Sequence, residues 1–92
     1  MFTLSAKLTF YIAHAASLKD KRRVRRGLID KTRHRFNATI AEIDAQDVLR
    51  TLVVGVAVVS GDDAFRRDAL EEIIRFMEEN ADAELVEVEY EF

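Results

Sequence analysis

The residues with the clearest capacity for chemistry lie in one basic segment, which runs from Lys19 to Arg35. This segment holds nine lysines and arginines against two acidic residues, Asp20 and Asp30, although the whole chain has a net charge of −3. Such side chains bind phosphate backbones by releasing the counterions condensed on a nucleic acid, whatever its base sequence. Arginine outnumbers lysine here, and its planar guanidinium suits two-point contact with phosphate. The segment therefore predicts a polyanion-binding surface, with RNA or the ribosome as the leading partner.

The spacing of apolar residues predicts that the basic segment is a helix. Ser17 precedes the first turn, where its hydroxyl can accept a backbone N–H, and Asp20 three residues later can complete a capping box. At 100° per residue the predicted buried face consists of Leu18, Val24, Leu28, Ile29, Thr32 and Phe36.

The basic side chains mostly project from the other side of this helix. The predicted nucleic-acid contacts are Lys19, Arg22, Arg23, Arg26 and Arg33. Lys21 lies at the margin of this set. Arg25 falls within the apolar arc, so we expect its stem to pack along that face while its guanidinium stays in water. Gly27 costs up to about 1 kcal/mol in mid-helix relative to alanine, which indicates close approach by another group.

The opposing interpretation is that acidic protein surfaces neutralise the basic helix. Residues 1–50 carry eleven Lys/Arg and five Asp/Glu, whereas residues 51–92 carry three and twelve. Many of these acidic residues fall in a predicted second helix, which would lie beside the first. Exposed ion pairs stabilise a protein by only about 0–1 kcal/mol each, but every such pair engages a cation that could otherwise contact a phosphate. At this point both alternatives are open: a non-enzymatic RNA-binding protein, or an interaction module whose basic helix pairs with acidic protein.

A second group of polar residues gathers around predicted strand ends: His14, Glu42, Asp44, Gln46 and Asp47. Close carboxylates can hold a hard cation or act as an acid–base pair. Turn capping explains these residues better, and the absence of cysteine removes thiol catalysis and Cys-ligated zinc. We therefore predict no catalytic site, no metal and no cofactor, and identify no small-molecule substrate; a hydrolase or metal enzyme built on these residues is the third alternative.

The elements that position these residues follow the order βαββαβ, as in ferredoxin-like domains. The predicted strands are Phe2–Ile12, Asn37–Asp44, Leu52–Val59 and Val86–Phe92. The second helix follows the turn at residues 60–63, where Asp63 helps to cap it, and ends near Asn80. Its apolar stripe consists of Phe65, Ala69, Leu70, Ile73, Ile74 and Met77. We therefore predict an α+β fold in which two helices cover one face of a four-stranded antiparallel sheet, with residues 1–92 forming one domain.

The predicted third strand is apolar on both faces, although the helices can cover only one of them. A homodimer through the open face or an edge strand is the simplest way to cover the other, and cover by loops or neighbouring side chains is the alternative. An RNA platform on that face is disfavoured, because the third strand has no aromatic residue and the first offers only Tyr11 on its polar side. An acylphosphatase is disfavoured because residues 13–17 contain no glycine to form a phosphate cradle. The N-terminus has no signal-peptide pattern and no apolar run is long enough to span a membrane, so a soluble cytoplasmic protein is expected.

Four segments with their spacing resemble the bacterial YlxP-like proteins, also called the DUF503 family: residues 17–24, 35–37, 41–47 and 55–60. The resemblance covers essentially the whole chain and implies a ferredoxin-like fold in a cytoplasmic protein. It implies no reaction and no catalytic residue. Family members are often encoded near genes for transcription, translation-initiation and ribosome-maturation factors, which by association favours a role with RNA. The chain departs from the family pattern at Arg25, Gly27 and Leu49.

Overall fold

The computed structural model describes residues 1–91, and within them all side chains except those of Asp63, Phe65 and Arg66. Predictions for the side chains of Asp63 and Phe65 and for Phe92 therefore lie outside the described residues. The elements are β1 (Phe2–Tyr11), α1 (Leu18–Arg35), β2 (Thr39–Asp44), β3 (Thr51–Ser60), α2 (Asp63–Asn80) and β4 (Glu84–Glu91). Their order confirms the predicted βαββαβ arrangement.

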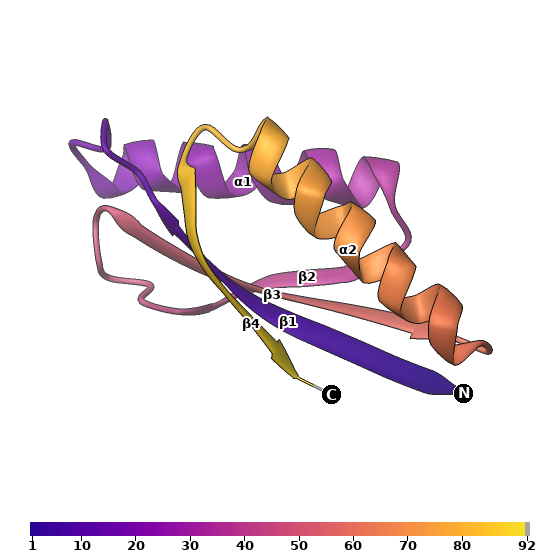
Figure 1. Cartoon of the computed structure of the whole chain (residues 1–92). Coiled ribbons are helices and arrows are strands. Elements are labelled where there is room, and N and C mark those ends of the chain that lie inside the picture. Colours follow the sequence, from indigo (N-terminus) through magenta and orange to yellow (C-terminus); the bar gives the residue numbers. More distant parts are fainter. Residues whose placement is uncertain (92) are drawn as a thin grey trace.

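The four strands form one antiparallel sheet in the order β2-β3-β1-β4, with both helices on one face (Figure 1). Leu8 and Phe10 of the central strand β1 point into the core beneath the helices and are fully buried. Their partners on β3, Val54 and Leu52, are buried on the same face. The α+β ferredoxin-like prediction is confirmed. No helix in the described part of the chain combines the length and apolarity needed to cross a bilayer.

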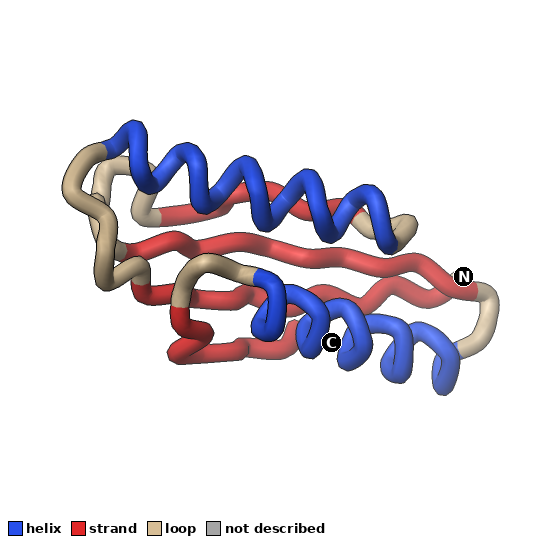
Figure 2. Tube along the Cα trace, turned by 90° about the horizontal axis from the view of Figure 1, so that it is seen from above, coloured by secondary structure: helices blue, strands red, loops and turns tan. Residues whose placement is uncertain are grey.

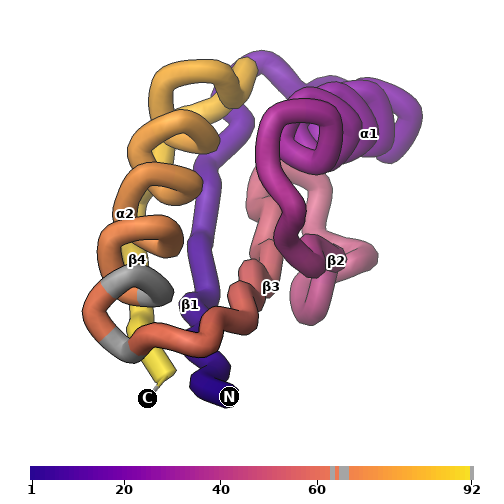
Figure 3. The backbone as a smooth tube through the Cα atoms, turned by 90° about the vertical axis from the view of Figure 1, so that its right-hand side faces the viewer, coloured from indigo at the N-terminus to yellow at the C-terminus, as the bar shows by residue number. Residues whose placement is uncertain are grey.

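The two helices lie over different strands of the sheet. α1 contacts β2, whereas α2 contacts β3 and β1, and the end-on view separates the helices clearly (Figure 3). The buried stripe of α2 contains four of its predicted residues, Leu70, Ile73, Ile74 and Met77. Figure 2 shows that the helices run in opposite directions and are staggered, so that α2 ends beside the middle of α1. The first turns of α1 therefore extend past the end of α2.

The buried face of α1 differs from the prediction in its first turn. Its buried residues are Lys21, Val24, Leu28 and Thr32, which follow one another at intervals of three and four. Leu18, predicted to be buried, is 44% exposed. In the first turn the buried face of α1 is occupied by Lys21 instead. Ile29 and Phe36 are half-buried and pack against the core as predicted.

The start of α1 is capped almost as predicted. The Ser17 hydroxyl accepts the backbone N–H of Asp20 at 3.2 Å. The Asp20 carboxylate, however, accepts the N–H of Ala16 at 3.0 Å rather than that of Ser17. This backbone hydrogen bond is the main cause that lowers the pKa of Asp20, assisted by the positive charge of Arg23. The carboxylate is thereby held ionised at the start of the basic helix.

The predicted alternation in the last strand is wrong at its first residue. A bulge interrupts the pairing of β4 with β1, so that Phe10 pairs with Leu85 and Thr9 with Glu87. Val86 is the extra residue and is 55% exposed, while Leu85 packs against the core. The extra residue of the bulge reverses which side chains of β4 face the core on its two sides. The alternation of apolar residues in the sequence does not indicate where this reversal falls.

The open face of the sheet is partly covered by side chains of the chain itself. Val53 is only 4% exposed although it lies on the face away from the helices, so neighbouring side chains cover it. Ile43 on β2 also packs over Gly55, since a Cβ on that glycine would meet its Cγ2 at 3.2 Å. Val59 and Ile43 remain 63% and 49% exposed. On this face Val59 is therefore exposed to water, whereas Val53 is covered within the chain, which was one of the alternatives to a dimer.

Candidate nucleic-acid interface

Four of the five predicted contacts form one exposed basic surface on α1. Together with Gly27 and Asp30, they line a groove of about 440 Å³: Lys19, Arg22, Arg23 and Arg26. All four are exposed, and no carboxylate of the described residues lies within ion-pair distance of their charged atoms. We call this set the free basic surface. Its cations are available to an external anion.

Lys21 does not belong to this surface, so its predicted place at the margin is wrong. Its side chain is buried and crosses beneath α1 to the loop between β2 and β3. There Nζ donates to the carbonyl oxygens of Ala45 at 2.6 Å, Val48 at 2.8 Å and Gln46 at 3.3 Å. A buried ammonium is stable only when such partners replace its lost water. Lys21 therefore holds a loop in place.

Glu42 on β2 takes a second cation away from the surface. Its Oε1 accepts a hydrogen bond from Nη1 of Arg25 at 2.9 Å, so the prediction that this guanidinium lies in water is wrong. Its Oε2 is buried and lies 3.3 Å from Nζ of Lys21. No hydrogen bond from a described residue reaches Oε2, so the Lys21 charge compensates it. The single carboxylate of Glu42 thus pairs with two of the nine cations, Lys21 and Arg25, and withdraws both from the basic surface.

The basic residues at the end of α1 are also engaged. Arg33, the fifth predicted contact, is exposed, but its Nη2 donates to the carbonyl oxygen of Ile40 at 2.7 Å. The Arg35 guanidinium lies 5.8 and 5.7 Å from the ring centres of Phe36 and Phe76, which pack edge to face. These contacts fix the C-terminal end of α1 against β2 and α2 and leave the free basic surface toward the N-terminal end.

The acidic second helix does not pair with the free basic surface in this structure. No ion pair joins α1 to α2 among the described side chains. The stagger of the helices accounts for this, because α2 ends beside the middle of α1 (Figure 2). Asp82, beyond the end of α2, lines a pocket with residues of α1, but its carboxylate is engaged by His14.

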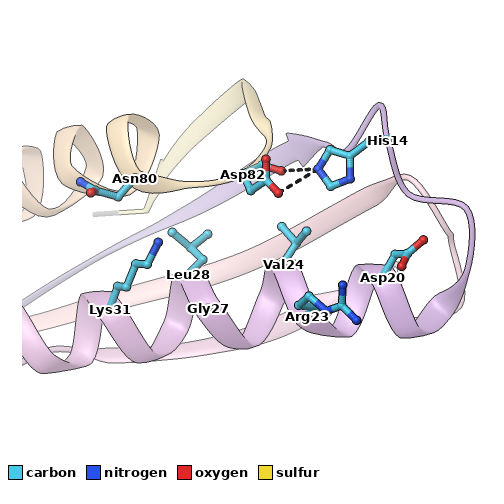
Figure 4. A pocket seen from close by; sticks show the side chains of 9 residues that line it. All are labelled: His14, Asp20, Arg23, Val24, Gly27, Leu28, Lys31, Asn80 and Asp82. Atoms are coloured by element: carbon cyan, nitrogen blue, oxygen red, sulfur yellow. Dashed lines mark hydrogen bonds and ion pairs between the residues drawn. The ribbon is translucent and has the colours of Figure 1, made fainter.

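A pocket of about 360 Å³ lies between α1 and the segment that follows α2 (Figure 4). Val24, Leu28 and Lys31 point from α1 toward Asn80 and Asp82. Leu28 and Val24 are buried and give the pocket an apolar floor.

The far wall of this pocket is held by a contact between two loops. Nε2 of His14 lies 3.1 Å from both the carbonyl oxygen and Oδ2 of Asp82. Both partners are acceptors, so Nε2 carries the proton. The loop before α1 is thereby joined to the loop after α2.

The predicted polar cluster of His14 with residues 42–47 is not assembled. His14 contacts Asp82, Glu42 contacts Lys21 and Arg25, and Asp44 accepts the N–H of Ala45 at 2.7 Å as a turn residue. Within the described side chains, no three of the types His, Cys, Asp and Glu lie close enough to hold a metal ion.

The sequence contained a signal for some of the residues that were missed. Lys21 shares the helical face of Val24 and Leu28, which should have placed it inside. Lys31 lies four residues after Gly27, and therefore on the same side of the helix as the pocket. Nothing in the sequence pattern indicated that Asn80 and Asp82 would meet α1, because that depends on the stagger of the helices.

Two comparisons with known proteins agree. The family described as "Protein of unknown function (DUF503)" matches residues 3–90. A relative from Bacillus subtilis (strain 168), named "Uncharacterized protein YlxP", is 31% identical over 67 residues, which cover 73% of each chain. Neither description includes an activity or a ligand.

Proposed function

We propose a function for this chain, which belongs to the DUF503 family of proteins of unknown function: it binds RNA, free or within the ribosome, through α1 and catalyses no reaction. We further propose that it acts in the cytoplasm. The observation that carries the proposal is the free basic surface, in which four exposed cations form no ion pair with a described carboxylate. Unpaired cations spaced along one helix match the repeating charge of a phosphate backbone.

The charge distribution of the rest of the molecule also supports RNA binding through this helix. The chain has a net charge of −3, so a basic surface that only maintained solubility would be unnecessary. Lys21 and Arg25 already satisfy the structural need for cations near β2. The four outward cations have no such role.

Reversing the charge of Arg22 and Arg26 together is expected to abolish RNA retention without unfolding the protein. Both side chains are exposed, and the variant Arg22→Glu, Arg26→Glu places two repulsive charges in the groove. The measurement is fluorescence anisotropy with a labelled single-stranded RNA of about 12 nucleotides, a length that suits one small domain. Four phosphate contacts predict that the logarithm of the wild-type binding constant falls with that of salt at a slope of about −3.

The matched control is Arg67→Glu, Arg75→Glu, which makes the same change of net charge on exposed positions of α2. It is expected to keep most of the affinity. Unchanged binding in the α1 variant, or equal losses in both variants, would contradict the proposal. Failure of the wild type to bind RNA at low salt, together with an oligomer that dissociates at high salt, would instead favour the interaction module whose basic helix pairs with acidic protein.

We propose as a second function the formation of a homodimer through the open face of the sheet. Val59 and Ile43 are largely exposed there. A shallow hollow of about 260 Å³ beside Ile43 is bounded partly by the small residues Ala41, Gly55 and Ala57. A flat face with small residues and exposed aliphatic side chains is suited to close approach by a second sheet.

Replacing Val59 with lysine is expected to convert this dimer to a monomer. The side chain is mostly in water within one chain, so the unfolding midpoint of the monomer should hardly change. Sedimentation equilibrium of the wild type, Val59→Lys and the control Leu18→Lys measures the mass of each. A wild-type monomer at high concentration, or a dimer that persists in Val59→Lys, would contradict this interface.

A further inference from the structure

The pocket and the groove of the free basic surface form one continuous binding surface. Arg23 and Gly27 line both of them. Gly27 lies at the seam, with the groove on one side and the apolar floor of Val24 and Leu28 on the other. A ligand that follows the groove therefore passes the mouth of the pocket.

The pocket differs from the groove in its chemistry. It has an apolar floor and a polar wall of Asn80, Asp82 and His14. Its charged lining is balanced, with the carboxylates of Asp20 and Asp82 beside the cations of Arg23 and Lys31, so a phosphate group is attracted less there than in the groove, where four cations lie beside Asp30. A nucleobase, by contrast, has apolar faces for the floor and edge N–H groups that a carboxylate or an amide oxygen can accept.

Gly27 gives independent support for a ligand at this place. A Cβ added to it would meet no atom within 4 Å other than its own immediate surroundings. It has no positive φ that would require glycine. The cost of mid-helix glycine, up to about 1 kcal/mol relative to alanine, is therefore not offset by packing within the chain. The free space lies at the seam between the groove and the pocket.

We infer that the ligand is single-stranded RNA, and that one unstacked base enters the pocket while its neighbouring phosphates lie on Arg23 and the rest of the free basic surface. This inference rests on the proposed RNA-binding function and adds the class of RNA to it. Duplex RNA keeps its bases stacked and offers mainly backbone to such a surface. Only single-stranded RNA can place a base in the pocket, so the pocket favours single-stranded over duplex RNA.

Two probes separate the base from the phosphates. One is a labelled single-stranded RNA of about 12 nucleotides, and the other is an abasic strand of the same length with the same phosphates. The wild type is expected to bind the RNA about tenfold more tightly than the abasic strand at the same salt concentration, since one stacked base contributes about that factor.

The matched variants are Gly27→Leu and Gly27→Ala. Leucine in a helix leans toward the preceding turn, and here that is toward Arg23 and Val24 across the seam. Alanine adds only a Cβ in open space. Both residues favour helix more than glycine does, so thermal unfolding should confirm that both variants are folded.

We expect Gly27→Leu to bring the affinity for RNA to within about twofold of that for the abasic strand, removing the contribution of the base. In both variants the affinity for the abasic strand should fall less than the affinity for RNA, and Gly27→Ala, which adds only a Cβ, should lose a smaller part of the base contribution than Gly27→Leu. Equal wild-type affinity for the two probes would overturn the inference and leave phosphate-only RNA binding intact. Equal losses for both probes in Gly27→Leu, or no loss for either, would also overturn it. A wild type that binds neither probe would refute the proposed function itself.

Discussion

Replacing Lys21 with methionine is expected to lower the free energy of unfolding by about 3–5 kcal/mol, the range for breaking a buried ion pair from one side. Methionine retains much of the apolar stem but removes the ammonium. Three loop carbonyl groups, at Ala45, Gln46 and Val48, then lose a donor at once. The buried Oε2 of Glu42 loses the charge that lies 3.3 Å away. For a domain of this size, such a loss is a large part of the total stability.

Urea denaturation measures this effect as a change in midpoint at constant slope. The matched control is Lys19→Met, which makes the same chemical change two residues earlier on an exposed position. Its effect should stay within about 0.5 kcal/mol. Similar midpoints for the two variants would show that Lys21 does not hold the loop as the structure indicates.

Replacing Glu42 with glutamine is expected to destabilise the protein by about 3 kcal/mol, because Lys21 then remains charged and buried without a counter-charge. The amide keeps the size of the side chain and one acceptor oxygen, but it removes the charge and turns an N–H donor toward Lys21 or Arg25. Arg25 is affected less, since its side chain is 30% exposed and can turn to water. The matched control is Glu89→Gln, which removes an exposed carboxylate 3.8 Å from Lys7. Exposed pairs of this kind contribute about 0–1 kcal/mol.

The energetic coupling between Lys21 and Glu42 tests the buried ion pair more directly than either single substitution. A double variant, Lys21→Met with Glu42→Leu, replaces the buried pair by apolar groups and leaves no isolated buried charge. Its cost should be clearly smaller than the sum for Lys21→Met and Glu42→Leu measured separately. Additive costs would mean that the two charges do not depend on each other.

Most of the fold was predictable because its signals are local. Alternation in β1, the continuous β-branched run of β3 and the apolar stripes of the two helices each depend on nearby residues. Apart from Lys21 and Leu18, whose places on α1 follow from local periodicity, the errors occurred where distant segments meet. The bulge opposite Thr9 and Phe10 exposes Val86, and no local pattern in β4 indicates that interruption.

The candidate interface was predictable only in part for the same reason. The side of α1 that carries Arg22 and Arg26 follows from helical periodicity alone. Whether each cation is available depends on what the rest of the chain brings to it. Glu42 engages Arg25 from β2, and Arg33 reaches a carbonyl oxygen of the same strand. The pocket required the end of α2 to lie beside the middle of α1, which periodicity does not determine.

The environment of Lys21 has a consequence for how the molecule is held together. Three carbonyl oxygens and a carboxylate around one positive centre form the kind of oxygen-rich shell that elsewhere surrounds a bound cation. Here the positive centre is covalently part of α1, so no ion has to be taken from solution. The order of the loop at residues 45–48 is therefore tied to the docking of α1 rather than to the ionic composition of the surroundings. The helix that carries the proposed RNA-binding surface and the loop beneath it become ordered as one unit.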